Sequence, residues 1–98
     1  MVPRPRRDAP RLFSPDWPDE PCTDPITEIA RNFALALRGA LDGMSLRTAE
    51  SLTGVDHSTI GAIVGGLTWP DLATIARLER GFDADLWPGR ARAAEQLP

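Results

Sequence analysis

The stretch MSLRTAESLTGVDHSTIGAIVGG, residues Met44–Gly66, combines two short helix patterns with a glycine-centred turn between them. Ser45 can cap the first helix, in which apolar residues recur at helical spacing. Gly54 tolerates the positive φ that a sharp reversal of the chain requires. Asp56 is the expected N-cap of the second helix, which begins near His57. Two short helices joined in this way predict a helix-turn-helix unit.

The apolar residues of this unit indicate which side of its second helix is buried. We expect Val55 to fill the angle between the two helices, and Ile60 and Ile63 to anchor the second helix on the core. The residues left outside are small or polar, with Thr59 at the edge: His57, Ser58, Gly61, Ala62 and Gly65. A helix presented with such a surface can enter the major groove of DNA.

A longer helix is predicted before this unit, over residues 25–42. Asp24 is its N-cap, Pro25 occupies the first helical position, and Gly43 ends it. Apolar residues, among them Phe33 and Leu37, recur along it at helical spacing and predict a buried face.

Another helix and a short final turn are predicted after the unit. Thr68 and Asp71 have the spacing of a capping box, and Gly81 is the expected end of the helix. The stretch FDADLWP, residues 82–88, predicts a fifth, short helical turn that folds back on the core. No strand pattern is present, so the sequence predicts a small all-α domain of five helices. The expected buried stripe of the fourth helix is Leu72, Ile75, Ala76 and Leu78.

Six prolines distinguish residues 1–24 from this domain and predict a flexible, partly extended arm. The chain thus divides into an arm (1–24), a helical domain (25–88) and a polar tail (89–98). Three roles remain open for the arm. It is a passive tail, it enters a DNA minor groove through its arginines, or it docks on the domain or a partner through Leu12, Phe13 and Trp17. The arginines are Arg4, Arg6, Arg7 and Arg11.

Composition limits the function classes. The 98 residues suffice for one small domain, and the net charge of −3 does not by itself indicate nucleic-acid binding. Cys22 is the only cysteine and His57 the only histidine, which excludes an intramolecular disulfide and a four-ligand zinc site within one chain. No phosphate-loop or paired-carboxylate pattern predicts an enzyme, a metal site or a cofactor. No apolar run reaches the ~20 residues of a membrane span, and the expected location is the cytoplasm.

Residues 26–88, through MSLRTAESLTGVDHSTIGAIVGG and TWPDLATIARLERGFDADLWP, resemble the lambda-repressor-like (Xre/Cro-type) helix-turn-helix regulators. The resemblance implies a sequence-specific transcriptional regulator that binds double-stranded operator DNA as a homodimer. Leu46 and Ala62 depart from the family, which often has Gln at the first position and Arg or Gln at the second. The implied base contacts, extended to one further hydroxyl, are His57, Ser58, Thr59 and Ala62. The implied phosphate contacts are Ser45, Arg47, Gly65 and Thr68, and the implied dimer surface is Leu78, Phe82, Leu86 and Trp87.

A protein-interaction module is the alternative function. A helix-turn-helix domain with an acidic surface can serve as an antitoxin or adaptor, with residues 1–24 as the contact to a protein partner. The net charge, the apolar Leu46 and Ala62, and an aromatic Trp17 in the arm favour this alternative.

Overall fold

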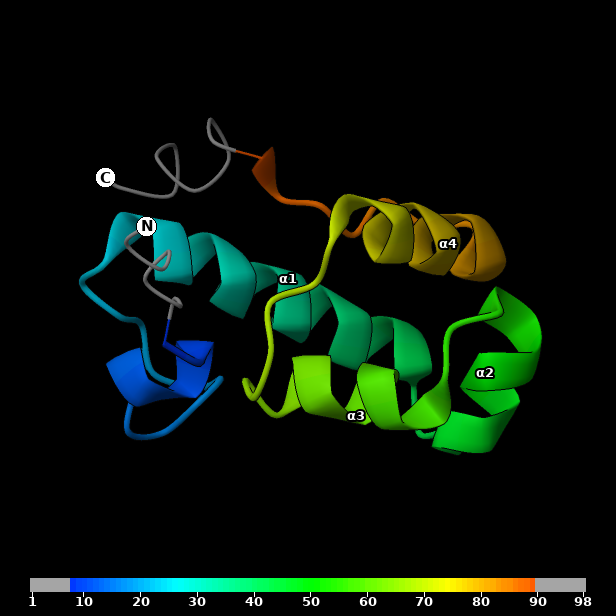
Figure 1. The fold of residues 1–98 in the computed structure, drawn as a ribbon, viewed down its shortest axis with the longest axis horizontal. Coiled ribbons are helices and arrows are strands. Elements are labelled where there is room, and N and C mark those ends of the chain that lie inside the picture. Colours follow the sequence, from blue (N-terminus) through cyan, green and yellow to red (C-terminus); the bar gives the residue numbers. More distant parts are fainter. Residues whose placement is uncertain (1–7, 90–98) are drawn as a thin grey trace, which may run out of the picture.

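The fold consists of helices only across residues 8–89, which are the residues that the structure, a computed structural model, describes. The chain forms a short 3-10 helix, η1 (Pro10–Phe13), and four α-helices (Figure 1). These are α1 (Pro25–Leu41), α2 (Leu46–Thr53), α3 (His57–Val64) and α4 (Leu72–Phe82). The prediction of an all-α domain is therefore confirmed. A fifth helix over residues 82–88 is not: residues 83–88 contain no helix, although Leu86 folds back into the core.

Each α-helix begins at a side chain that accepts a hydrogen bond from a first-turn amide. Asp24, Ser45 and Asp56 cap α1, α2 and α3, as the sequence predicts. The capping box proposed for α4 is wrong, because Asp71 is itself the N-cap and accepts from the Thr74 N–H at 2.7 Å. Pro70 explains the later start. The residue before a proline is disfavoured in the helical region, so a helix capped by Thr68 would have an unfavourable first residue.

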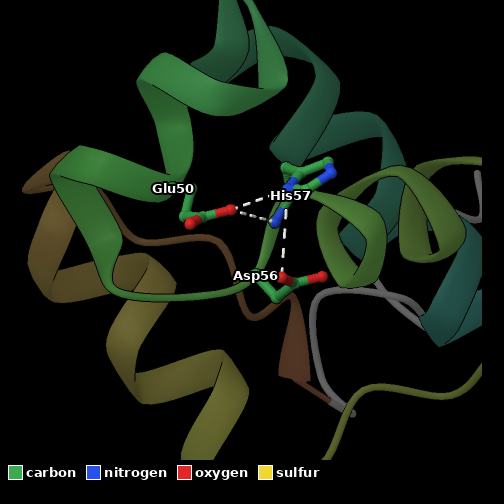
Figure 2. Close-up of side chains that lie close together, drawn as sticks. All are labelled: Glu50, Asp56 and His57. Carbon is green, nitrogen blue, oxygen red and sulfur yellow. Dashed lines mark hydrogen bonds and ion pairs between the residues drawn. The ribbon is translucent and has the colours of Figure 1, made fainter.

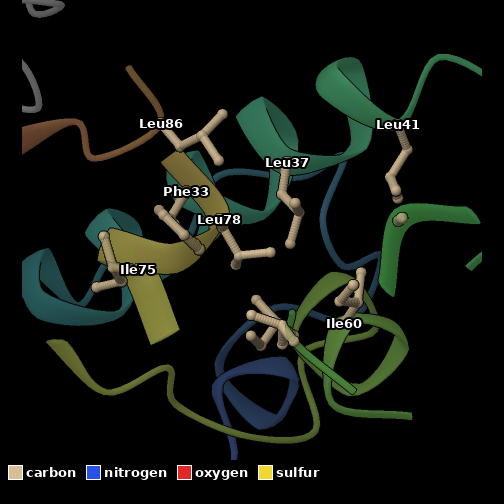
Figure 3. Packing of buried hydrophobic residues seen from close by; sticks show 10 residues of the cluster. Phe33, Leu37, Leu41, Ile60, Ile75, Leu78 and Leu86 are labelled. Carbon is tan, nitrogen blue, oxygen red and sulfur yellow. The ribbon is translucent and has the colours of Figure 1, made fainter. Parts of the chain in front are cut away.

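The core lies where α1 crosses behind α3 and α4 (Figures 1 and 3). Val55, Ile60 and Ile63 are buried in it, which confirms the predicted inner face of the helix-turn-helix unit. The stripe predicted for α4 is only half right: Ile75 is buried, but Leu72 is 82% exposed and Ala76 is also exposed. The other core members come from α1, α2, α4 and the segment after α4: Phe33, Leu37, Leu41, Ala49, Leu78 and Leu86.

The sequence predicts that Gly81 ends α4, but the residue has a different role in the structure. Helix α4 continues through it to Phe82. A Cβ at Gly81 would lie 2.5 Å from the Thr53 Cα and 2.7 Å from the Leu52 carbonyl oxygen. Glycine at this position therefore allows α4 to contact the backbone at the end of α2, and no larger side chain fits there.

The described part of the N-terminal arm, residues 8–24, packs against the domain. The Arg11 N–H donates to the Gly66 carbonyl at 2.9 Å, and the Trp17 Nε1–H donates to the Val64 carbonyl at 2.9 Å. Gly66 has a φ of +71°, and a Cβ there would lie 2.7 Å from the Trp17 indole. Residues 8–24 thus differ from the flexible arm that the prolines predict, and Trp17 docks on the domain. Arg4, Arg6 and Arg7 lie outside the described residues.

A second set of contacts fixes the other end of this segment to α1. Arg31 donates from Nε and Nη2 to the two carboxylate oxygens of Glu28, at 2.8 and 2.6 Å, and from Nη1 to the Pro18 carbonyl at 2.9 Å. The Cys22 N–H also donates to Glu28, at 3.1 Å. Burial, followed by the hydrogen bond to Glu28, raises the pKa of the Cys22 thiol to about 11. A thiol with this pKa stays protonated near neutral pH and is a poor nucleophile.

Candidate nucleic-acid interface

The helix-turn-helix geometry arises from a short turn between α2 and α3. Gly54 has a φ of 75°, in the left-handed region, and its N–H donates to the Glu50 carbonyl at the end of α2. The Val55 N–H donates to the Thr53 hydroxyl at 3.1 Å, which satisfies a buried amide within the turn. With Val55 buried beneath the turn, the chain enters α3 at a defined angle to α2.

Three ionisable side chains meet at the start of α3 (Figure 2). One carboxylate oxygen of Glu50 accepts hydrogen bonds from both the backbone N–H and the ring Nδ1 of His57, each at 2.8 Å. A carboxylate only accepts, so the His57 proton is on Nδ1. In the neutral ring, Nε2 is then an acceptor for a base amino group, whereas in the charged ring it is a donor. Of these three residues, only His57 was a site candidate in the sequence.

The two carboxylates carry negative charge beside the exposed start of α3. The His57 ring and amide hold the pKa of Glu50 below its ordinary value of 4.5. The Ser58 hydroxyl and amide likewise hold the pKa of Asp56 below 3.8, and Asp56 lies 3.8 Å from His57 Nδ1. Both charges favour the helix because they lie near the positive end of its dipole. They also repel a phosphate backbone.

The same three side chains are the only His, Cys, Asp or Glu group among residues 8–89 with the spacing of a metal site. Their ligand atoms lie within 4.8 Å of one another. Three ligands are fewer than a closed structural zinc site uses, and both carboxylates already accept backbone N–H groups. These contacts account for the positions of Glu50 and Asp56 without an ion.

The remaining base-contact candidates present few free donors. The Ser58 hydroxyl donates to the Asp56 carboxylate, so its proton is engaged within the chain. Thr59 and Ala62 are half-buried. Gly61 lies under α2, since a Cβ there would come within 3.1 Å of the Leu46 side chain. Leu46 thus packs on α3, which gives a packing reason for an apolar residue at the position where the family often has Gln.

The phosphate-contact candidates divide into two engaged and two available groups. The Ser45 hydroxyl caps α2 and also donates to the Thr48 hydroxyl at 2.9 Å. The Gly65 N–H donates to the Gly61 carbonyl at 2.9 Å. Arg47 and Thr68 are exposed. The structure therefore places one cation, Arg47, among the four predicted positions.

The loop after α3 has its first amides committed within the chain. The Gly66 N–H donates to the Ile63 carbonyl at 3.1 Å, and the Leu67 N–H donates to the Ala62 carbonyl at 2.9 Å. With the Gly65 bond, three consecutive amides are engaged, so none of them is free to bind a phosphate. The sequence Gly-Gly-Leu does not indicate that its amides are engaged, because their acceptors depend on how the chain turns after α3.

The four residues of the predicted dimer surface differ in their burial within this chain. Leu78 and Leu86 are buried in this chain's own core, because α4 and the segment after it close that core. Phe82 is half-buried, and Trp87 is 47% exposed. Trp87 lines an apolar pocket of about 340 Å³ between the first half of α1 and the start of α4. Its other lining residues are Ile26, Ile29, Ala30, Phe33, Trp69, Pro70, Leu72 and Ile75.

Comparisons with protein-family models, curated proteins and solved structures find no significant match to this chain. The likeness to lambda-repressor-like regulators therefore stays a prediction from the residues of the helix-turn-helix unit. Within residues 8–89, no helix has the length and apolar character needed to cross a membrane.

Proposed function

We propose that this chain is a sequence-specific, DNA-binding transcriptional regulator of the lambda-repressor-like type, acting in the cytoplasm as a homodimer. In this function α3 enters the major groove, with His57 as the principal base-reading side chain. Residues of the arm and of α2 hold the DNA backbone. The chain carries no catalytic role.

One observation carries the proposal: a short, capped helix is presented on a glycine turn, with its apolar side chains buried and small side chains outside. Ile60 and Ile63 fasten α3 to the core, so its position does not depend on DNA. A rigid helix with an outer surface of small residues can approach base edges closely.

His57 supports the proposal through its free ring nitrogen. Glu50 fixes the ring through Nδ1, at 2.8 Å, and the side chain is 35% exposed. A ring oriented by a second residue loses less rotational freedom when it contacts a base.

Selection of bound DNA from a random double-stranded pool tests the proposal. We expect an enriched motif at low salt, and a weaker but similar motif at higher salt. His57→Ala should change the preferred motif, whereas Arg47→Ala should weaken binding to all sequences alike. A pool that remains unenriched at both salt concentrations would contradict sequence-specific binding.

A protein-interaction module is the second candidate, and the carboxylates beside α3 favour it. Glu50 and Asp56 are both more than 40% exposed as side chains and carry negative charge. Such a surface is complementary to a basic partner, as in an antitoxin or adaptor. Capture of a basic protein by the wild-type chain, lost in the double variant Glu50→Gln, Asp56→Asn, would favour this function over DNA binding.

A further inference from the structure

Arg11 and Arg47 differ from the other arginines that the structure describes. Arg31 is paired with Glu28, and Arg38 with Asp19 at 2.9 Å. Arg77 and Arg80 lie on α4, which is not the helix offered to DNA. Arg11 and Arg47 are exposed and form no ion pair among residues 8–89. Of the four described arginines without an ion pair, only Arg11 and Arg47 therefore lie next to α3, on η1 and α2.

These two residues lie on elements at opposite ends of α3: α2 lies beside the start of this helix and η1 lies beyond its end (Figure 1). Arg47 follows Leu46, whose side chain contacts the middle of α3 at Gly61. Arg11 is bonded through its backbone N–H to the carbonyl of Gly66, two residues past the end of α3. Helix α3 has eight residues, a length of about 12 Å, and the major groove of B-DNA is also about 12 Å wide. A helix that lies across that groove has a phosphate backbone near each of its ends.

The loop after α3 cannot make the phosphate contact on its own side through its first amides. The N–H groups of Gly65, Gly66 and Leu67 are engaged in the chain, and residues 65–68 include no cation. The docked segment 8–24 supplies a cation, Arg11, beside the end of α3. Arg11 lies within η1, which the Leu12 N–H closes by donating to the Ala9 carbonyl at 3.0 Å. Its backbone is therefore held in place before any ligand binds.

We propose that Arg11 is a phosphate-binding residue, placed beside the end of α3 by the docked segment 8–24. It complements Arg47, which lies on the helix packed beside the other end of α3. The segment is then part of the interface with the nucleic-acid backbone, although most of its side chains do not touch DNA. This inference rests on the proposed DNA-binding function and names the residue that holds the second side of the groove.

The test measures the affinity of the full chain for a duplex across a range of salt concentrations. The variants are Arg11→Ala and Arg11→Gln, and Arg77→Ala is the matched control because it removes the same charge from exposed α4. We expect both Arg11 variants to bind about tenfold more weakly at low salt, similarly for all sequences. The slope of log K against log salt should decrease in magnitude by about 0.9, as for one lost phosphate contact.

Three outcomes decide whether Arg11 binds a phosphate. A decreased slope for the Arg11 variants, with the slope of Arg77→Ala unchanged, supports the proposal. An unchanged slope in Arg11 variants, while wild type binds DNA with a normal salt dependence, overturns the role of Arg11 and leaves DNA binding intact. Absence of any binding by wild type overturns both. Thermal unfolding of each variant separates these results from misfolding, since a structural role would change Tm and leave the slope unaffected.

Discussion

Two carboxylates of this chain, Glu28 and Glu50, bind the side chains of Arg31 and His57 in contrasting surroundings. The Arg31 side chain is 9% exposed and that of Glu28 is 20% exposed. The His57 and Glu50 side chains are 35% and 42% exposed. Both pairs include hydrogen bonds of 2.8 Å or shorter, so distance does not distinguish them. The two pairs differ instead in the burial of their side chains and in the number of further hydrogen-bond partners.

The comparison separates a structural pair from one that can respond to a ligand. Arg31 also binds the Pro18 carbonyl, and Glu28 also accepts from Cys22, so the buried pair holds the N-terminal segment on α1. The exposed pair orients His57 at the start of α3 while water can still replace either partner. A ligand that contacts His57 can therefore change the second pair at little cost to folding.

Arg31→Ala should have the largest effect on stability. The substitution leaves the Glu28 carboxylate and the Pro18 carbonyl without their donor, and breaking a largely buried pair costs about 3 kcal/mol. Urea unfolding at pH 7 measures the loss. Arg38→Ala is the control, because its pair with Asp19 is exposed and contributes about 0–1 kcal/mol. Equal losses in the two variants would contradict the structural role of Arg31.

Trp17→Ala should have the next largest effect, about 2 kcal/mol, through loss of the indole that covers Gly66 and of its bond to the Val64 carbonyl. Gly66→Ala should destabilise the same contact, because the added Cβ displaces the indole. A double-mutant cycle measured by urea unfolding checks the connection. If the two losses add fully, Trp17 and Gly66 are not coupled and the segment is held by other contacts.

Glu50→Gln tests the exposed pair through the pH dependence of stability. The pKa of Glu50 is lowered in the folded chain, so its charge stabilises the fold above pH 4.5, and this contribution is lost as the pH falls further. Gln keeps an acceptor for His57 but cannot titrate. We expect the variant to lose less stability than wild type between pH 5 and pH 2. Parallel stability curves, measured by urea unfolding across that range, would rule out a contribution from this pair.

His57→Ala should have the smallest effect on folding, because the ring lies at the surface and Asp56 still caps α3. Its effect should appear in DNA binding, as a changed sequence preference. Selections from a random duplex pool with wild type and variant measure it. Ser58→Ala is a useful comparison, since the Ser58 hydroxyl proton is already engaged by Asp56. Identical motifs from wild type and His57→Ala would contradict a base-reading role for the ring.

The helix-turn-helix unit was predictable because its signals are local. The caps Ser45 and Asp56, the turn at Gly54, and the buried residue Ile60 follow from properties of residues a few positions apart. The later start of α4 was missed at the sequence level, although Pro70 carried a local signal for it.

The candidate site was only partly predictable, because some of its contacts depend on how the helices and the N-terminal segment pack together. His57 and Arg47 were identified from their place in the unit. The partnership of Glu50 with His57, seven residues apart across the turn, depends on the angle between α2 and α3. Arg11 was assigned to a flexible arm because prolines restrict local structure but do not indicate which distant surface a segment will contact.

By itself, the sequence determined the helices, most of their boundaries and the glycine turn, since backbone propensity, capping and apolar spacing act over one or two helical turns. Only the tertiary structure decided that Trp17 covers Gly66, that Arg31 holds Pro18, and that Gly81 lies against the backbone of α2. Those outcomes depend on close packing and on satisfying buried polar groups between segments distant along the chain. Such requirements arise only when the segments meet.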